Sequence, residues 1–224
     1  MQVIIAGTGK LATELRQALG SSPHYSVTAW AQHPSPPQKA IVVHAGSGRE
    51  LGDIAAYCEA SASPLLELST GSAIENQAPG FPVVLCPNTN ILMLKFMAML
   101  AHSGAMFKSY DMTLIESHQA GKTSVPGTAV SMAQSLGLQP EAIQSIRDTQ
   151  IQQTQLQIAE ADLPRHAYHQ ILIQDGACSV KLETRVTGDS PYAHGVDQII
   201  RAVMARELEH RVYPVMAFIE YGWL

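Results

Sequence analysis

Charge, cysteine and long apolar runs are all scarce in this 224-residue chain. Charged residues make up 15% of it, and the 14 lysines and arginines are scattered rather than gathered into a stripe. Without a basic stripe the chain has no means of neutralising a phosphate backbone, so we expect no nucleic-acid partner. Hydrophobic residues account for 46% of the chain, which argues against disorder and predicts one large domain or two modest ones.

The three cysteines, Cys58, Cys86 and Cys178, are odd in number and far apart. That pattern predicts reduced, buried thiols rather than a disulfide framework, and none of them has the spacing of a zinc site. The apolar run from Val3 to Ala6 is too short for a signal peptide, and no other run is long enough to cross a bilayer. We therefore expect a cytoplasmic protein with no metal and no membrane partner.

The order of the predicted elements is typical of a parallel sheet with crossover helices, followed by a mixed sheet. Strands are expected at 1–6, 25–30, 40–43, 65–68 and 81–85, with helices at 10–19 and 49–60. Further along, strands are expected at 111–117, 169–173 and 179–186, with helices at 91–101, 126–136 and 193–211.

The predicted fold class is therefore α/β: a Rossmann-type parallel-sheet domain plus an α+β domain with a mixed, largely antiparallel sheet. Residues 1–90 and 195–224 are assigned to dinucleotide binding, and residues 91–194 to substrate binding and oligomerisation. The antiparallel strands are expected to turn around Asp175-Gly176. An exposed face of the second sheet favours a homo-oligomer, either a dimer or a tetramer.

A glycine-rich turn follows the first strand and opens the first helix. Gly7 and Gly9 bracket Thr8, and Ala12 fills the third small position of the pattern. Small residues let a pyrophosphate approach the amide groups at the positive end of the helix, so the context favours a dinucleotide site that includes Lys10 and Leu11. An ordinary strand-to-helix turn is the alternative interpretation.

The end of the second predicted strand lacks a carboxylate. NAD sites usually place an Asp or Glu there to bind the free ribose, whereas this chain has Ala31-Gln32-His33. We therefore favour NADPH over NADH, with Lys10, His33 and Lys39 as candidates for a 2′-phosphate. A solvated surface position is the alternative for all three, and for Lys39 above all.

Three further segments carry a family pattern. Ser69-Thr70-Gly71 stands at the place of a Gly-Thr-Thr-Gly loop, and Pro87-Asn88 at that of a Pro-Asn-Phe-Ser turn. The segment 116–129 runs alongside Glu-x-His-His-x-x-Lys-x-Asp-x-Pro-Ser-Gly-Thr-Ala. On these motifs the chain resembles the dihydrodipicolinate reductase family, as a short and divergent member.

The resemblance implies reduction of 4-hydroxy-tetrahydrodipicolinate with NADPH or NADH in lysine and diaminopimelate biosynthesis. It implies that His118 is the proton donor and that Lys122 assists it or holds charge. Gln119, Gly127 and Thr128 would then bind the dicarboxylate substrate, the last two by opening a helix. The nicotinamide would meet a set of loop residues: Ser69, Thr70, Gly71, Pro87 and Asn88.

The chain departs from the pattern at the substrate end. Gln119 replaces the second histidine, Ser124 replaces the aspartate, and the serine before Gly127 is absent. These changes favour a second interpretation, a related oxidoreductase acting on another small imine, keto acid or amino acid. A third is a nucleotide sensor without turnover, against which His118 and Lys122 argue.

Other polar residues of this half carry weaker expectations. Glu116 is expected only to cap or pair with a neighbour, and His166, His169 and His194 to take core or surface positions. The run 189–195 resembles the family's approach to its last helix.

Overall fold

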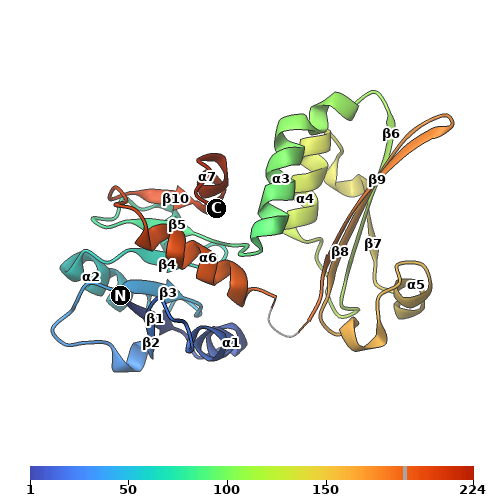
Figure 1. The fold of residues 1–224 in the computed structure, drawn as a ribbon. Helices are drawn as coiled ribbons and strands as arrows, with labels where there is room; N and C mark the ends of the chain where they lie inside the picture. The colour runs from blue at the N-terminus through green and yellow to red at the C-terminus, as the bar shows by residue number, and fades with distance from the viewer. Residues whose placement is uncertain (189–190) are drawn as a thin grey trace. The chain divides into compact units, whose positions relative to one another are not determined.

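The computed structural model describes residues 1–188 and 191–224, which divide into two compact units (Figure 1). The first unit consists of Met1–Leu94 and Tyr192–Leu224, and the second of Lys95–Pro191. Asp189 and Ser190, the start of the predicted motif before the last helix, lie outside the described residues. The predicted fold class is confirmed, because one unit holds a parallel sheet and the other a mixed sheet.

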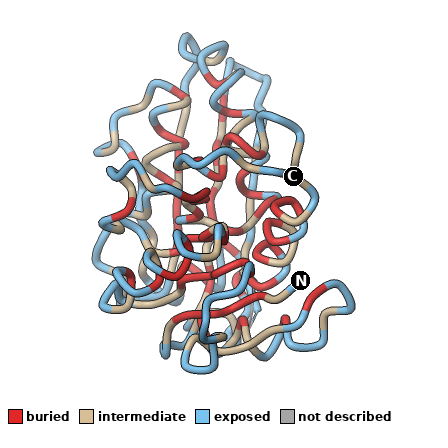
Figure 2. The backbone as a smooth tube through the Cα atoms, turned by 90° about the vertical axis from the view of Figure 1, so that its left-hand side faces the viewer, coloured by how far each residue is buried: buried red, intermediate tan, exposed pale blue. Residues whose placement is uncertain are grey.

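The sheet of the first unit is parallel throughout its described residues, in the order β10-β5-β4-β3-β1-β2. Its strands are β1 (Gln2–Ala6), β2 (Ser26–Ala29), β3 (Ile41–His44), β4 (Leu65–Glu67), β5 (Val83–Leu85) and β10 (Val212–Pro214). Strands covered on both faces need apolar residues at every position, which is why β1, β3, β4 and β5 were recognisable as short continuous runs. Figure 2 shows the resulting band of buried backbone.

Helices cover this sheet on both faces. They are α1 (Lys10–Leu19), α2 (Leu51–Ser61), α6 (Ala193–Met204) and α7 (Val215–Glu220), and α3 (Ile91–Ser103) begins in this unit and continues into the second. Ile4, Val42 and Leu65 are neighbours in register on β1, β3 and β4, and they share one core with Ile54 and Tyr57 of α2. α1 and α6 contact each other, and the Tyr25 hydroxyl donates to Asp197 at 2.6 Å.

The last part of the chain differs from the prediction. The helix expected at 193–211 ends at Met204, and β10 and α7 follow it. Within residues 205–211 the apolar side chains are Ala205 and Leu208, so a continued helix would have had little apolar surface to bury. β10 adds a sixth parallel strand to the five expected, and its three residues were too few to show a pattern.

The second unit is built on a mixed sheet in the order β7-β6-β8-β9. Its strands are β6 (Asp111–His118), β7 (Ile143–Ile146), β8 (Ala167–Asp175) and β9 (Cys178–Val186), and its helices include α4 (Gly127–Leu136) and α5 (Thr149–Thr154). β6 pairs with β7 in parallel and with β8 antiparallel, and β8 and β9 form the predicted hairpin at Asp175-Gly176. β7 and α5 were missed, because four and six residues are too short to show a period.

Two further observations concern burial. Cys58 and Cys86 are buried as expected, but Cys178 is exposed, because β9 is an edge strand. No helix within residues 1–188 and 191–224 has the length and apolar character needed to span a bilayer.

The packing of α6 yields a stability prediction. Gly195 lies against the backbone of Thr89, and a methyl group there would overlap the Thr89 carbonyl oxygen. Gly195→Ala should therefore lower the free energy of unfolding by about 3 kcal/mol. Gly52→Ala is the matched control, because no described atom lies within 4 Å of that Cβ position on α2. It should leave stability unchanged or raise it by about 0.5 kcal/mol. Equal effects in urea denaturation would contradict this packing.

Candidate functional site

The glycine turn of the first unit is shaped by close backbone packing. Gly7 has φ +120°, and a Cβ on it would overlap the Ala45 carbonyl, so only glycine fits. Gly9 precedes α1 in an extended conformation, and within the described residues no side chain caps this helix and no acidic residue lies in its first turn. The first amide groups of α1 therefore lack a capping side chain within the described residues, which suits the binding of an anion.

The other predicted cofactor residues lie at the same edge of the sheet. Parallel pairing aligns Ala6 with His44, His44 with Glu67, and Glu67 with Leu85. The segments that follow these strand ends hold the candidate residues: Gly7, Thr8, Gly9, Lys10, Leu11, Ser69, Thr70, Gly71, Pro87 and Asn88. Ligands of open α/β sheets bind beyond the carboxyl ends of the strands, and that is where these segments are gathered.

The three candidate phosphate-binding cations do not share one edge. Lys10 is 75% exposed and lies 4.0 Å from Glu14. His33 stacks on Trp30 at 4.3 Å between ring centroids, and its Nδ1 donates to the Trp30 carbonyl at 2.6 Å. Lys39 precedes β3 and lines a cavity with Met1, so it lies at the amino edge of the sheet, opposite to Lys10.

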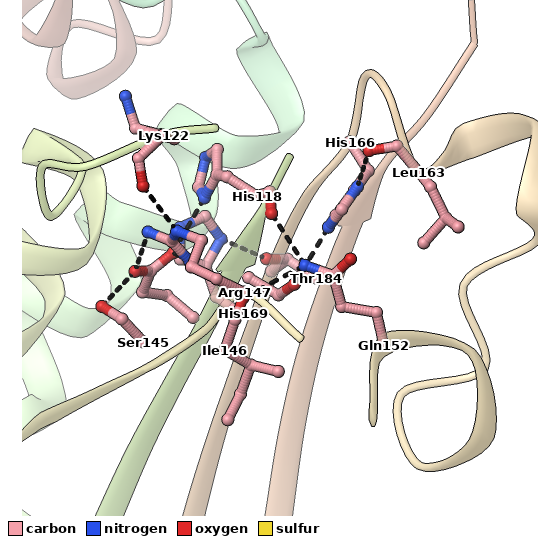
Figure 3. Close-up of polar contacts among 12 residues, drawn as sticks. His118, Lys122, Ser145, Ile146, Arg147, Gln152, Leu163, His166, His169 and Thr184 are labelled. Carbon is pink, nitrogen blue, oxygen red and sulfur yellow. Dashed lines mark hydrogen bonds and ion pairs between the residues drawn. The ribbon is translucent and has the colours of Figure 1, made fainter. Parts of the chain in front are cut away.

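In the second unit, one row of polar side chains crosses the sheet. Glu116 on β6 pairs in register with Ser145 on β7 and with His169 on β8, and His169 pairs with Thr184 on β9. Side chains alternate along a strand, so His118, two residues after Glu116, lies on the same face. The described strands of this sheet thus contribute to one polar cluster (Figure 3).

Glu116 is the centre of this cluster. Its side chain is 0% exposed and accepts hydrogen bonds from His118 Nδ1 at 2.8 Å, from Arg147 Nη2 at 2.6 Å and from the Ser145 hydroxyl. Burial alone would raise the pKa of this carboxyl group, but the donors of His118, Arg147 and Ser145 outweigh it and lower the pKa to about 2. Glu116 is therefore a buried anion at neutral pH.

The two imidazoles beside Glu116 differ in character. His118 is 14% exposed and uses Nδ1 for Glu116, which leaves Nε2 for a ligand. His169 packs edge-on against it with ring centroids 5.8 Å apart, and its Nδ1 lies 3.1 Å from the Thr184 hydroxyl. Burial and the electrostatic interaction with the neighbouring His118 lower the pKa of His169 to about 4, so His169 is uncharged at neutral pH.

Arg147 also fixes the loop after β6. Its Nε donates to the Lys122 carbonyl at 2.9 Å, and the Lys122 amide donates to the Gln119 carbonyl at 3.0 Å. The Lys122 side chain extends away from Arg147 (Figure 3). The Gln119 side chain is exposed. One guanidinium thus connects the buried carboxylate to the loop that carries Gln119, predicted to bind substrate, and Lys122, predicted to assist the proton donor.

The same loop ends at the start of α4. Pro126 precedes this helix, and within the described residues no side chain caps it and no acidic residue lies in its first turn. Gly127 is exposed and Thr128 half-buried. Backbone amides and a hydroxyl at this position are suited to a carboxylate.

A second network lies on the opposite face of β6. Gln152 Nε2 donates to the Ser117 hydroxyl at 3.0 Å and to the His118 carbonyl at 2.8 Å, and His166 Nε2 lies 2.9 Å from the same hydroxyl. Both networks hold the carboxyl end of β6: Glu116 contacts the His118 imidazole on one face, and Gln152 contacts the His118 carbonyl from the other.

Sequence reasoning missed most of this cluster. Glu116 was expected only to cap or pair locally, although its spacing from His118 on a predicted strand places both on one face. His169 was assigned only a core or surface position, and its burial fits that, but not its contact with His118. The sequence did not predict Arg147 and Ser145 as members of the cluster, because β7 was not predicted.

The comparison with known families agrees with these motifs. A family model described as "Dihydrodipicolinate reductase, C-terminus" matches residues 90–219, more than half of the chain. The chain belongs to the dihydrodipicolinate reductase family. A plant member, 4-hydroxy-tetrahydrodipicolinate reductase 1 of Arabidopsis thaliana, is 31% identical over 126 residues, which cover 52% of this chain and 36% of that relative. A probable reductase of Oryza sativa subsp. japonica is 34% identical over 96 residues, which cover 40% and 28%. The matches thus span about a third of the relatives' length.

Two solved structures show the same fold as this family member. A dipicolinate-bound dihydrodipicolinate reductase from Paenisporosarcina sp. TG-14 has a TM-score of 0.68 at 16% identity, covering 96% of this chain and 97% of that one. The C. glutamicum DAP dehydrogenase in complex with DAP has a TM-score of 0.54 at 7% identity, covering 96% and 93%.

The Glu116 cluster yields a prediction on pH. The folded pKa of Glu116, about 2, lies below the ordinary 4.5, so its ionisation stabilises the fold above pH 4.5 and that contribution is lost as the pH falls toward 2. Arg147→Met should lower the free energy of unfolding by about 3 kcal/mol at neutral pH, because it leaves a buried charge without its cation. The difference in the free energy of unfolding between wild type and variant, measured by urea denaturation, should become smaller below pH 4.5, because Glu116 becomes protonated.

Arg185→Met is the matched control. Arg185 pairs with Glu183 on the surface and is 37% exposed, so its removal should cost less than about 1 kcal/mol. Equal losses for the two arginine variants, or a loss for Arg147→Met that does not change with pH, would contradict the role given to Glu116.

Proposed function

We propose that this protein reduces 4-hydroxy-tetrahydrodipicolinate to tetrahydrodipicolinate, the reaction of lysine and diaminopimelate biosynthesis, with a nicotinamide cofactor as the reductant. The observation that carries the proposal is the pair formed by His118 and the buried Glu116, which one short loop joins to the uncapped start of α4. The names of the relatives in Arabidopsis and Oryza support the choice of substrate.

The turn at Gly7 fits such a cofactor. Within the described residues the first turn of α1 carries no capping side chain and no carboxylate, and no atom lies within 4 Å of a Cβ position on Gly9. A pyrophosphate would be held there by amide groups, with the segments at Ser69–Ser72 and Pro87-Asn88 toward the nicotinamide. When bound, the cofactor supplies the hydride. Lys10 and His33 favour NADPH over NADH, since no carboxylate at the end of β2 would repel a 2′-phosphate.

His118 is the proton donor in this proposal. Reduction of a conjugated imine leaves a carbon that must accept a proton, and a histidine side chain is the commonest general acid in proteins. Because Glu116 occupies Nδ1, the transferred proton comes from Nε2. The ionised carboxylate stabilises the charged imidazole before the transfer and leaves the proton on Nδ1 afterwards, so it also fixes which nitrogen reacts.

Residues of the loop after His118 would bind the substrate. The amides of Gly127 and Thr128 at the start of α4 suit one carboxylate, and the Lys122 ammonium supplies a positive charge. Gln119 can donate a hydrogen bond but carries no charge, so it binds a second carboxylate less tightly than a histidine would. This one position favours a second candidate function, reduction of another small imine or keto acid.

The assembly and location of the protein remain predictions. β9 is an exposed edge strand of nine residues, and an edge of that length favours pairing with another copy in a dimer or tetramer. We expect the protein to act in the cytoplasm, whereas the relatives from Arabidopsis and Oryza are named as chloroplastic.

The proton-donor role is tested by following NADPH oxidation with freshly prepared substrate. His118→Ala should lower kcat by about a hundredfold or more, because the developing carbanion loses its acid. Binding of NADPH, measured by fluorescence titration, should not change. His102→Ala on α3, an exposed histidine of the same unit, is the matched control and should keep full activity. Full activity in His118→Ala would rule out His118 as the proton donor. NADPH binding without turnover in the wild type would rule out 4-hydroxy-tetrahydrodipicolinate as the substrate.

The substrate is tested at the position that departs from the family pattern. Gln119→His should lower KM for 4-hydroxy-tetrahydrodipicolinate by about fivefold with little effect on kcat, because a charge-assisted hydrogen bond to a carboxylate replaces a neutral one. A KM that rises or does not change would favour the second candidate function, with a substrate that has one carboxylate fewer.

A further inference from the structure

A buried histidine and a buried glutamate pair at the carboxyl edge of the parallel sheet. His44 ends β3 and Glu67 ends β4, the two are neighbours in register, and both side chains are 0% exposed. His44 Nδ1 lies 2.9 and 2.7 Å from the two carboxylate oxygens of Glu67. Residues at the other positions of β3 and β4 are apolar. Buried charged pairs can often be replaced by apolar residues without loss of stability, so this pair points to a role besides stability.

Glu67 also binds the segment that follows it. Its Oε1 accepts the amide of Ser69 at 2.8 Å, and its Oε2 accepts the hydroxyl of Ser72 at 3.0 Å. Burial raises the pKa of Glu67, but the hydrogen bonds from His44 and Ser69 outweigh burial and lower it. The carboxylate is therefore ionised at neutral pH and accepts from a strand neighbour and from both ends of one loop.

The loop from Ser69 to Ser72 has further fixed points. Glu75 accepts the amides of Gly71 at 2.7 Å and of Ser72 at 3.0 Å, and the Ser69 hydroxyl donates to the Gly46 carbonyl at 3.0 Å. Gly71 adopts φ +70°, which suits glycine. These bonds set the loop in one conformation with Thr70 exposed at its tip.

In the described part of the chain, the second ring nitrogen of His44, Nε2, makes no hydrogen bond that would explain the residue. Nε2 is buried and has no hydrogen-bond partner among the described residues, and it lies 4.0 Å from Glu50. A buried nitrogen left unsatisfied costs free energy, so the contact through Nδ1 must compensate for it. That contact orients the carboxylate of Glu67, and Glu67 in turn accepts hydrogen bonds from Ser69 and Ser72 of the loop.

We propose that Glu67, oriented by His44, is a positioning residue that holds the loop from Ser69 to Ser72 in the conformation that binds the nicotinamide end of the cofactor. The inference rests on the proposed function, which places the cofactor at this edge. Glu67 does not touch the cofactor; it acts through the amide of Ser69 and the hydroxyl of Ser72.

The test uses two substitutions of His44 in the full chain. His44→Asn keeps a donor near the place of Nδ1, whereas His44→Leu removes it. By fluorescence titration, His44→Leu should bind NADPH about tenfold more weakly, and His44→Asn should bind within about twofold of the wild type. Ser72→Ala, a milder change at a half-buried position, should weaken binding by about threefold. Glu59→Gln, an exposed glutamate of α2, is the matched control and should bind like the wild type.

Hydrogen exchange without cofactor gives a second readout. The amides of Ser69, Gly71 and Ser72 should exchange faster in His44→Leu and in Ser72→Ala than in the wild type and His44→Asn, while amides of β1 keep their protection. Exchange unchanged in Ser72→Ala, or faster exchange with unchanged NADPH affinity, would overturn the inference. A wild type that binds neither NADPH nor NADH would overturn the proposed function instead, and the exchange data would still report on the loop.

Discussion

The buried carboxylate of Glu116 is the interaction on which the second unit depends. A charge with no exposure must be paired, and here the partners come from separate elements: His118 on the same strand, Ser145 on β7, and Arg147 just beyond it. Arg147 also donates to the carbonyl of Lys122. The arginine that neutralises Glu116 therefore also fixes the loop that leads to α4. Removing a partner leaves an uncompensated charge, which costs more than an exposed ion pair contributes.

The first unit uses the same chemistry for a different purpose. In both units a glutamate at or near the carboxyl end of a strand accepts from the Nδ1 of a histidine, His44 for Glu67 and His118 for Glu116. The exposure of the imidazole separates them, at 0% for His44 and 14% for His118. The second nitrogen of His44 is buried and makes no hydrogen bond within the described residues, so the contact of His44 with Glu67 is a positioning one. A histidine whose second nitrogen is accessible can exchange a proton with a ligand, which is why we place chemistry at His118 and loop positioning at His44.

The sequence predicted those helices and strands in which burial produces a regular pattern of apolar residues. Continuous apolar runs marked β1 and β3, and leucines at helical spacing marked α1, because those residues face a core. Four short elements were not predicted, because three to six residues are too few to show a periodic pattern: β7, α5, β10 and α7. In the candidate site, His118 and Lys122 were predicted from a family motif, and their roles stay predictions. Arg147 was not predicted, because it reaches Glu116 across strands that are neighbours only in space.

The central claim is that ionised Glu116 fixes the reacting nitrogen of His118. Imidazole nitrogen NMR measures this directly, because the two nitrogens of a neutral histidine report which of them carries the proton. The account predicts that uncharged His118 carries its proton on Nδ1 in the wild type and shifts toward the Nε2-protonated form in Glu116→Gln. A wild-type His118 protonated on Nε2, or a tautomer that Glu116→Gln leaves unchanged, would contradict it.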